Sequence, residues 1–157
     1  MNKCKLNLRK VVAIAICLAG VTMFSSCEED ENSKSMPDPT GTITIKVRNW
    51  SNGGTSVYPE GCEGTFYITS ANNFRANWGN WTFARVGKVA GLGNVTGIPS
   101  SGYATEVSVE PGCGYVAKID RGNGNVTYVR IYVVSWTEAS TGGIIGAEIK
   151  YQSPFNP

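Results

Sequence analysis

The 157-residue sequence contains no histidine. Histidine is the usual general base beside a nucleophilic serine or cysteine, and it is the commonest metal ligand in proteins. Its absence excludes Ser-His-Asp and Cys-His catalysis. Only Cys62 and Cys113 remain in the region that we expect to fold, and a structural zinc site takes four ligands. We therefore predict no metal site and no cofactor.

Charged residues are also scarce, at 17% of the chain, and the formal net charge is only +2. From Thr40 onward there are nine basic and seven acidic residues. Proteins that bind nucleic acids usually carry a basic stripe, so we predict no nucleic-acid partner. Outside the N-terminus no apolar pattern follows the helical period, and no repeat of a propeller or solenoid is visible.

The one long apolar run lies at the N-terminus, after four basic residues. It spans residues 11–21 and would be only about 16 Å long as a helix, whereas a bilayer core needs about 30 Å. This layout is typical of a cleaved secretory signal peptide rather than of a transmembrane anchor. Ser25-Ser26-Cys27 resembles the lipobox of bacterial lipoproteins, with Phe24 where leucine is common. The resemblance implies cleavage before Cys27 and attachment of lipid to Cys27, which would be a membrane anchor.

An acidic cluster, residues 28–31, follows Cys27 directly. A cluster at this place resembles the signal that sends lipoproteins of Bacteroidetes-type bacteria to the outer face of the outer membrane. The alternative is a solvated spacer, since blocks of like charge repel and stay disordered. We predict a signal peptide over 1–26, a lipidated Cys27 with an acidic disordered tether over 27–39, and a folded domain over 40–157. We expect the protein to be lipid-anchored in the outer membrane and exposed at the cell surface.

Apolar and polar residues alternate along the folded region and are interrupted by turn residues, a pattern that predicts β-strands. The clearest segments are 43–47, 103–110, 115–119, 126–136 and 145–151, with shorter strands expected at 65–69, 83–89 and 94–98. The later segments favour an antiparallel meander, whose apolar face must be covered by other strands. We therefore predict an all-β fold, a single antiparallel β-sandwich of the immunoglobulin-like or transthyretin-like kind.

Cys62 and Cys113 lie in similar turn-like contexts of a chain that we expect to be exported into an oxidising setting. We expect a disulfide between them. It would close a loop of about fifty residues and stabilise the fold by about 4 kcal/mol. Two buried free thiols, packed as small apolar groups, are the alternative.

Aromatic residues are the candidate ligand-binding feature. Alternation along 126–136 places Val129, Ile131 and Val133 on one face. The other face would carry an aromatic stripe of Tyr128, Arg130, Tyr132 and Trp136. Trp78 and Trp81 lie in an asparagine-rich loop of similar composition. Binding sites pair apolar surface with a few polar groups, and sugar rings stack on flat aromatic platforms. The alternative is that these rings are half-buried with one polar tip satisfied.

Paired carboxylates would allow glycoside hydrolysis if two of them lay about 5–10 Å apart. Any domain of this size offers such pairs, and here the candidates are Glu60, Glu63, Glu106, Glu110, Asp120, Glu138 and Glu148. The glycine-rich stretch 91–97 lacks the Lys-Ser/Thr pair of a phosphate-binding loop. We predict no catalytic residue and no enzyme activity.

Several short motifs in the second half of the chain occur together: VGKV (86–89), GLG (91–93), IP (98–99), PGCGYV (111–116), IIGA (144–147) and KYQSPF (150–155). As a set they resemble a family of small Bacteroidetes-type surface lipoproteins with a domain of unknown function. The resemblance implies a surface location and brings no site residues. We therefore expect an outer-membrane lipoprotein that acts as a non-enzymatic binding module, with glycans as the candidate ligand. The alternatives are an assembly or accessory subunit that binds a protein partner of the cell envelope, and a small glycoside hydrolase.

Overall fold

The computed structural model describes residues 34–78 and 80–157. The expected signal peptide, Cys27 and the acidic cluster 28–31 lie outside the described residues. Among the residues that are described, no helix has the length and apolar character needed to cross a membrane.

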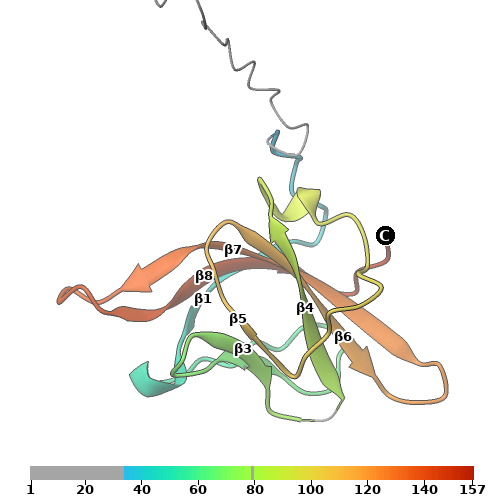
Figure 1. Ribbon diagram of the computed structural model, residues 1–157, viewed down its shortest axis with the longest axis horizontal. Coiled ribbons are helices and arrows are strands. Elements are labelled where there is room, and N and C mark those ends of the chain that lie inside the picture. The colour runs from blue at the N-terminus through green and yellow to red at the C-terminus, as the bar shows by residue number, and fades with distance from the viewer. Residues whose placement is uncertain (1–33, 79) are drawn as a thin grey trace, which may run out of the picture.

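Two antiparallel sheets make up the fold (Figure 1). The larger has the order β1-β8-β7-β6-β4, formed by β1 (Ile43–Arg48), β8 (Ile144–Gln152), β7 (Val126–Glu138), β6 (Cys113–Asp120) and β4 (Trp81–Lys88). The smaller has the order β2-β3-β5, formed by β2 (Phe66–Ile68), β3 (Asn73–Ala76) and β5 (Glu106–Ser108). Two short 3-10 helices lie in the connections, η2 (Trp50–Asn52) and η3 (Leu92–Asn94). The predicted all-β sandwich is confirmed.

Large aromatic side chains fill the space between the two sheets. Phe66 and Phe74 come from the small sheet, Phe83 and Tyr115 come from the large sheet, and all four are fully buried. The rings of Phe74 and Tyr115 meet edge to face, with centroids 5.1 Å apart and planes at 84°. Such pairs contribute about 0.5–1.5 kcal/mol beyond the burial of their area. Aromatic packing therefore fixes the short strands of the small sheet against the large one.

The opposite face of the large sheet is covered as well. Val95 and the C-terminal Phe155 pack there against Val116 of β6, with Tyr128 of β7 partly buried beside them. Strand β6 is consequently buried on both faces, which accounts for its nearly continuous apolar sequence.

One extra residue in β7 changes the face to which its later side chains point. The pairing with β8 shifts register between Val133 and Ser135, which leaves Val134 as a bulge. A bulge offsets the alternation by one residue. Trp136 therefore packs against the main core between the sheets. The prediction that Trp136 lies on the outer face with Tyr132 is wrong, because regular alternation carries no sign of the bulge.

The last part of the predicted tether lies against the domain. Asn94, at the end of η3, accepts a hydrogen bond from the backbone N–H of Met36 at 3.0 Å and donates one to the carbonyl of Lys34 at 3.0 Å. A Cβ on Gly93 would stand 2.9 Å from the carbonyl oxygen of Met36. The glycine thus leaves room for this segment. Residues 34–39 are docked on the domain, which shortens the tether predicted over 27–39.

Tyr115 joins the connection between β5 and β6 to the core. Its hydroxyl accepts a hydrogen bond from the N–H of Glu110 at 2.8 Å and donates one to the carbonyl of Ser108 at 2.9 Å. Burial raises the pKa of Tyr115 from 10.0 to about 12. The protonated hydroxyl is the form that both hydrogen bonds require.

Replacing Tyr115 with phenylalanine should lower the free energy of unfolding by about 1–2 kcal/mol at neutral pH, because the two hydrogen bonds between its buried hydroxyl and the backbone are lost. The contribution of the raised pKa is fully present below pH 10 and is lost as the pH rises toward 12, since the unfolded chain releases this proton first. Urea titrations of both proteins at neutral and alkaline pH measure the two effects. If alkaline pH lowered the free energy of unfolding equally in the wild type and in Tyr115→Phe, the stabilising role of the Tyr115 hydroxyl would be contradicted.

Candidate functional site

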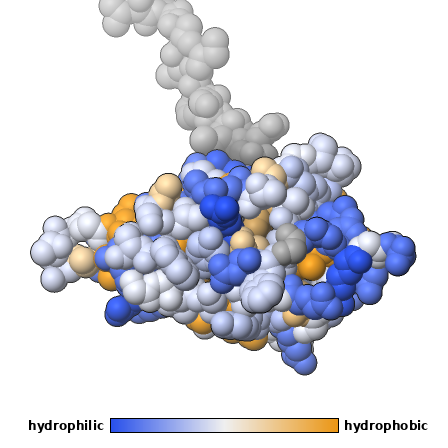
Figure 2. Space-filling view, turned by 90° about the horizontal axis from the view of Figure 1, so that it is seen from below, coloured by the Kyte–Doolittle hydropathy of each residue, from blue (hydrophilic) through white to orange (hydrophobic). Residues whose placement is uncertain are grey.

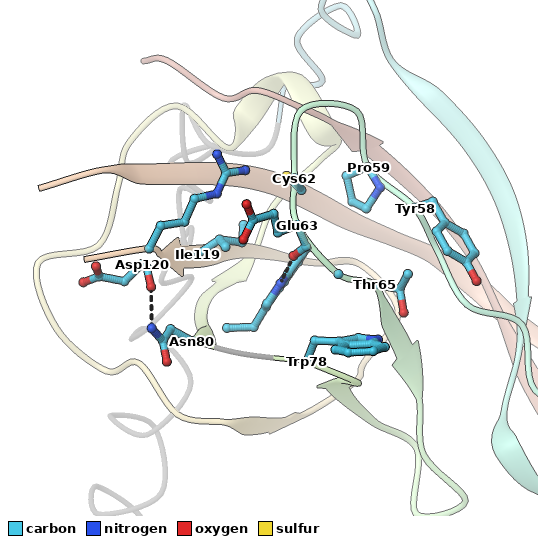
Figure 3. A pocket seen from close by; sticks show the side chains of 12 residues that line it. Tyr58, Pro59, Cys62, Glu63, Thr65, Trp78, Asn80, Ile119 and Asp120 are labelled. Carbon is cyan, nitrogen blue, oxygen red and sulfur yellow. Dashed lines mark hydrogen bonds between the residues drawn. The ribbon is translucent and has the colours of Figure 1, made fainter. Parts of the chain in front are cut away.

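An open-sided pocket of about 580 Å³ lies where the loop 58–65 meets the start of β4 and the end of β6 (Figure 3). Pockets for small molecules occupy about 300–1,000 Å³, so this volume is sufficient for a ligand. Two buried apolar side chains line it, Trp81 and Ile119. Figure 3 shows Trp78 and Tyr58 toward one side of the pocket and Asn80 and Asp120 toward the other.

Trp78 is the most informative residue of the pocket. Its side chain is 71% exposed, yet its base is packed closely against Gly64. A Cβ on Gly64 would lie 3.2 Å from the Cβ of Trp78 and 3.3 Å from Nε1 of Trp81, and Gly64 has a φ of +86°. Only glycine therefore suits this position in both space and backbone conformation. Tyr58, which is 75% exposed, adds a second ring to the same pocket.

The loop 58–65 is held in place by side chains from three other segments. Each donates a hydrogen bond to a carbonyl of the loop: Ser153 to Glu60 at 2.7 Å, Arg121 to Gly61 at 2.7 Å and Trp81 to Glu63 at 2.8 Å. A wall that is already fixed loses little conformational entropy when a ligand binds. The pocket is thus preorganised.

Polar groups surround the aromatic part of the pocket. Asn80 donates its amide hydrogen to the carbonyl of Asp120 at 2.7 Å, and its side-chain oxygen remains as an acceptor. Nε of Arg121 is buried and has no hydrogen-bond partner among the residues that the structure describes. The carboxylate of Asp120 accepts from the N–H of Gly122 at 2.9 Å and lies 3.4 Å from Nζ of Lys118. These two interactions, the hydrogen bond first, lower the pKa of Asp120.

Within residues 34–78 and 80–157, no group of three or more Cys, Asp or Glu side chains is placed to hold a metal ion. What the pocket offers is therefore a pair of exposed aromatic rings with hydrogen-bonding groups around them. This combination suits a ligand with both apolar faces and hydroxyl groups.

The structure brings together two of the predicted ligand-binding residues, Trp78 and Trp81, in this pocket. It does not form a platform from the aromatic stripe. Tyr128 packs into the outer apolar cluster, and Trp136 packs on the opposite face of the sheet. Tyr132 is half-buried on β7.

Arg130 of the stripe is engaged inside the protein. It donates hydrogen bonds to Oε1 of Gln152 at 2.7 Å and to the carbonyl of Val95 at 3.1 Å. Its guanidinium carbon also lies 4.7 Å from the centroid of the Phe155 ring. Arg130 therefore fastens the C-terminal segment to β7.

Sequence reasoning missed Tyr58 and Arg121 as pocket residues. Arg121 stands at the start of the turn that follows β6, and that turn approaches the loop 58–65 only through long-range contacts. Nothing in the local pattern around either segment indicates this approach. The asparagine-rich composition of residues 72–80 was the one local signal that pointed to this place.

The predicted disulfide between Cys62 and Cys113 is absent, and both residues are free thiols. Cys113 begins β6, where its sulfur lies 3.2 Å from a guanidinium nitrogen of Arg85. Cys62 lies in the pocket beside residues 119–121, at the other end of β6. Seven residue steps along a strand span about 23 Å, whereas the Cα atoms of a disulfide lie within about 7 Å.

Alkylation of the protein before any reduction should label both thiols once the chain is denatured. In the native protein Cys62 should react slowly at neutral pH, because burial raises the pKa of its thiol and the thiolate is the reactive form. Cys113 should be protected until unfolding. Peptide mapping by mass spectrometry assigns the label to each cysteine, and a peptide in which Cys62 and Cys113 are joined would contradict the structure.

The structure is that of an all-β sandwich domain with a pocket at one end that aromatic residues help to line. A family model described as a domain of unknown function (DUF5036) matches residues 44–155, and the chain belongs to this family. The match includes every segment that lines the pocket. No curated protein and no solved structure matches the chain. The expected likeness to a family with a domain of unknown function is confirmed to this extent.

Proposed function

We propose that this protein is a non-enzymatic binding module that holds carbohydrate in the pocket of Trp78. The observation that carries the proposal is the exposed indole of Trp78 on a fixed base, within a pocket that has polar groups around it. A sugar ring has apolar C–H faces that stack on such an indole. Its hydroxyl groups need donors and acceptors, and Asn80 and Arg121 supply both.

Hydrolysis of the sugar is less well supported than binding. The pocket contains two carboxylates, Glu63 and Asp120. The general acid of a glycosidase is a carboxyl group whose pKa is raised, whereas the pKa of Asp120 is lowered, so Asp120 does not suit that role. The carboxylate of Asp120 is also already occupied by Gly122 and Lys118. We therefore propose no catalytic role for this pair.

Figure 2 shows no large continuous hydrophobic area on the face that it draws. Hydrophobic areas on that face are small and separated by pale and hydrophilic residues. A stable interface between proteins buries about 800 Å² on each partner, and its centre is depleted in charge. An envelope protein as partner remains the alternative that the binding experiment below distinguishes.

We further propose that lipid on Cys27 anchors the domain in the outer membrane, with the pocket on the side away from the bilayer. The docked segment 34–39, which leads back toward Cys27, lies beside η3, while the pocket lies at the start of β4 (Figure 1). The eight residues of β4 span about 23 Å between these two ends. This distance would keep the pocket accessible to soluble glycans.

Full-length protein, purified in detergent, should bind saturably to members of a broad glycan array. Trp78→Ala should weaken that binding by up to about tenfold, because the contact with one aromatic ring contributes up to about 1.5 kcal/mol. Tyr132→Ala is the matched control, since it removes an aromatic ring from the predicted stripe outside the pocket. Loss of binding in Tyr132→Ala with retention in Trp78→Ala would place the site on β7, and no binding to any glycan would move the proposal to a protein partner.

Proteinase added to intact cells should degrade the protein if it is anchored at the cell surface. A Cys27→Ser variant should lose the lipid and appear in a soluble fraction, since a cysteine thiolate is the group that receives it. A known periplasmic protein serves as the control for intact membranes. Degradation that occurs only after lysis would contradict surface exposure.

A further inference from the structure

A second hollow lies on the other side of Trp78. It measures about 210 Å³ and is lined by Arg75, Asn77 and Thr105 as well as by Trp78 and Trp81, which also line the main pocket. Ligand pockets rarely fall below about 300 Å³, so this hollow is too small for a ligand of its own. Because Trp78 and Trp81 line both hollows, we treat the second hollow as an extension of the main pocket, so that the two together form one larger site.

The surface beyond this hollow continues the same chemistry. Arg75 is exposed on β3, where it stands opposite Tyr67 of β2 on one side and Glu106 of β5 on the other. The ring of Tyr67 lies 5.3 Å from that of Trp50, which is 58% exposed. The outer face of the small sheet thus carries aromatic rings beside an arginine.

Arg75 also has N–H donors that are available to a ligand. It forms no ion pair with any residue in the described ranges 34–78 and 80–157. Its guanidinium carries five N–H donors. A row of sugar hydroxyls passing over the second hollow would meet these donors.

We infer that the ligand is an oligosaccharide of several units, whose chain crosses Trp78 from the main pocket into the second hollow and is held there by Arg75. This inference rests on the proposed function, since it names the length of the carbohydrate that the Trp78 pocket binds. The shared wall is the structural reason: one indole, exposed on a fixed base, borders both hollows. A chain of sugar rings can occupy both at once, whereas a single sugar occupies one.

The test uses full-length protein in detergent and ladders of one to six sugar units prepared from xylan, mannan, chitin and pectin. For the ladder that binds, affinity should rise at least about tenfold between the shortest and the longest member, the factor expected for one or two additional net hydrogen bonds. Arg75→Ala should abolish most of this rise and leave binding of the shortest ligand unchanged. Lys46→Ala, which removes one exposed positive charge from β1, is the control.

A second variant blocks the hollow without removing a donor. Thr105→Tyr adds a ring at an exposed position that lines the second hollow, so it should also flatten the dependence on chain length. Equal affinity for short and long members, unchanged by either variant, would overturn the inference and leave the proposed function intact. Failure of every ladder to bind would overturn both.

Discussion

The position of the small sheet depends on aromatic rings that it buries against the large sheet. Its strands have only three or four residues each, too few for a sheet to be stable alone. Phe66 of the small sheet meets Phe83 and Tyr151 of the large sheet edge to face. Phe74 meets Tyr115 of the large sheet in the same way. Two parts of the pocket wall are attached to this sheet, since the loop 58–65 leads into β2 and β3 leads into Trp78. The geometry of the pocket is therefore a consequence of the aromatic core.

The large sheet leaves no exposed face over β6 and β7 on which a ligand could bind. Its inner face packs in the main core, and its outer face is covered by Val95 and Phe155. Arg130 closes this cover by holding the C-terminal segment. Exposed aromatic rings are left at the end of the sandwich, where loops meet. Loops on a rigid scaffold are the usual place for binding residues, and three side-chain hydrogen bonds make this one rigid.

Local patterns in the sequence were enough to predict the fold class and the approximate place of most strands, because burial of one face enforces alternation. The same reasoning failed at Trp136, since a single bulge at Val134 reverses the faces and leaves no mark in composition. The prediction of a disulfide failed for a related reason. Similar turns around Cys62 and Cys113 say nothing about the length of β6 that separates them. For the candidate site, Trp78 and Trp81 could be identified from a local cluster, whereas Arg121 and Tyr58 join it through contacts that only the folded chain reveals.

The most direct test of this account is to follow the indole N–H signals of the four tryptophans by NMR while a glycan that binds on the array is added. The account predicts that the Trp78 signal shifts with ligand concentration and that the Trp136 signal, which belongs to the core, stays in place. A shift of Trp136 with Trp78 unchanged would contradict it, because the site would then lie on β7 and the pocket at the end of the sandwich would have no part in binding.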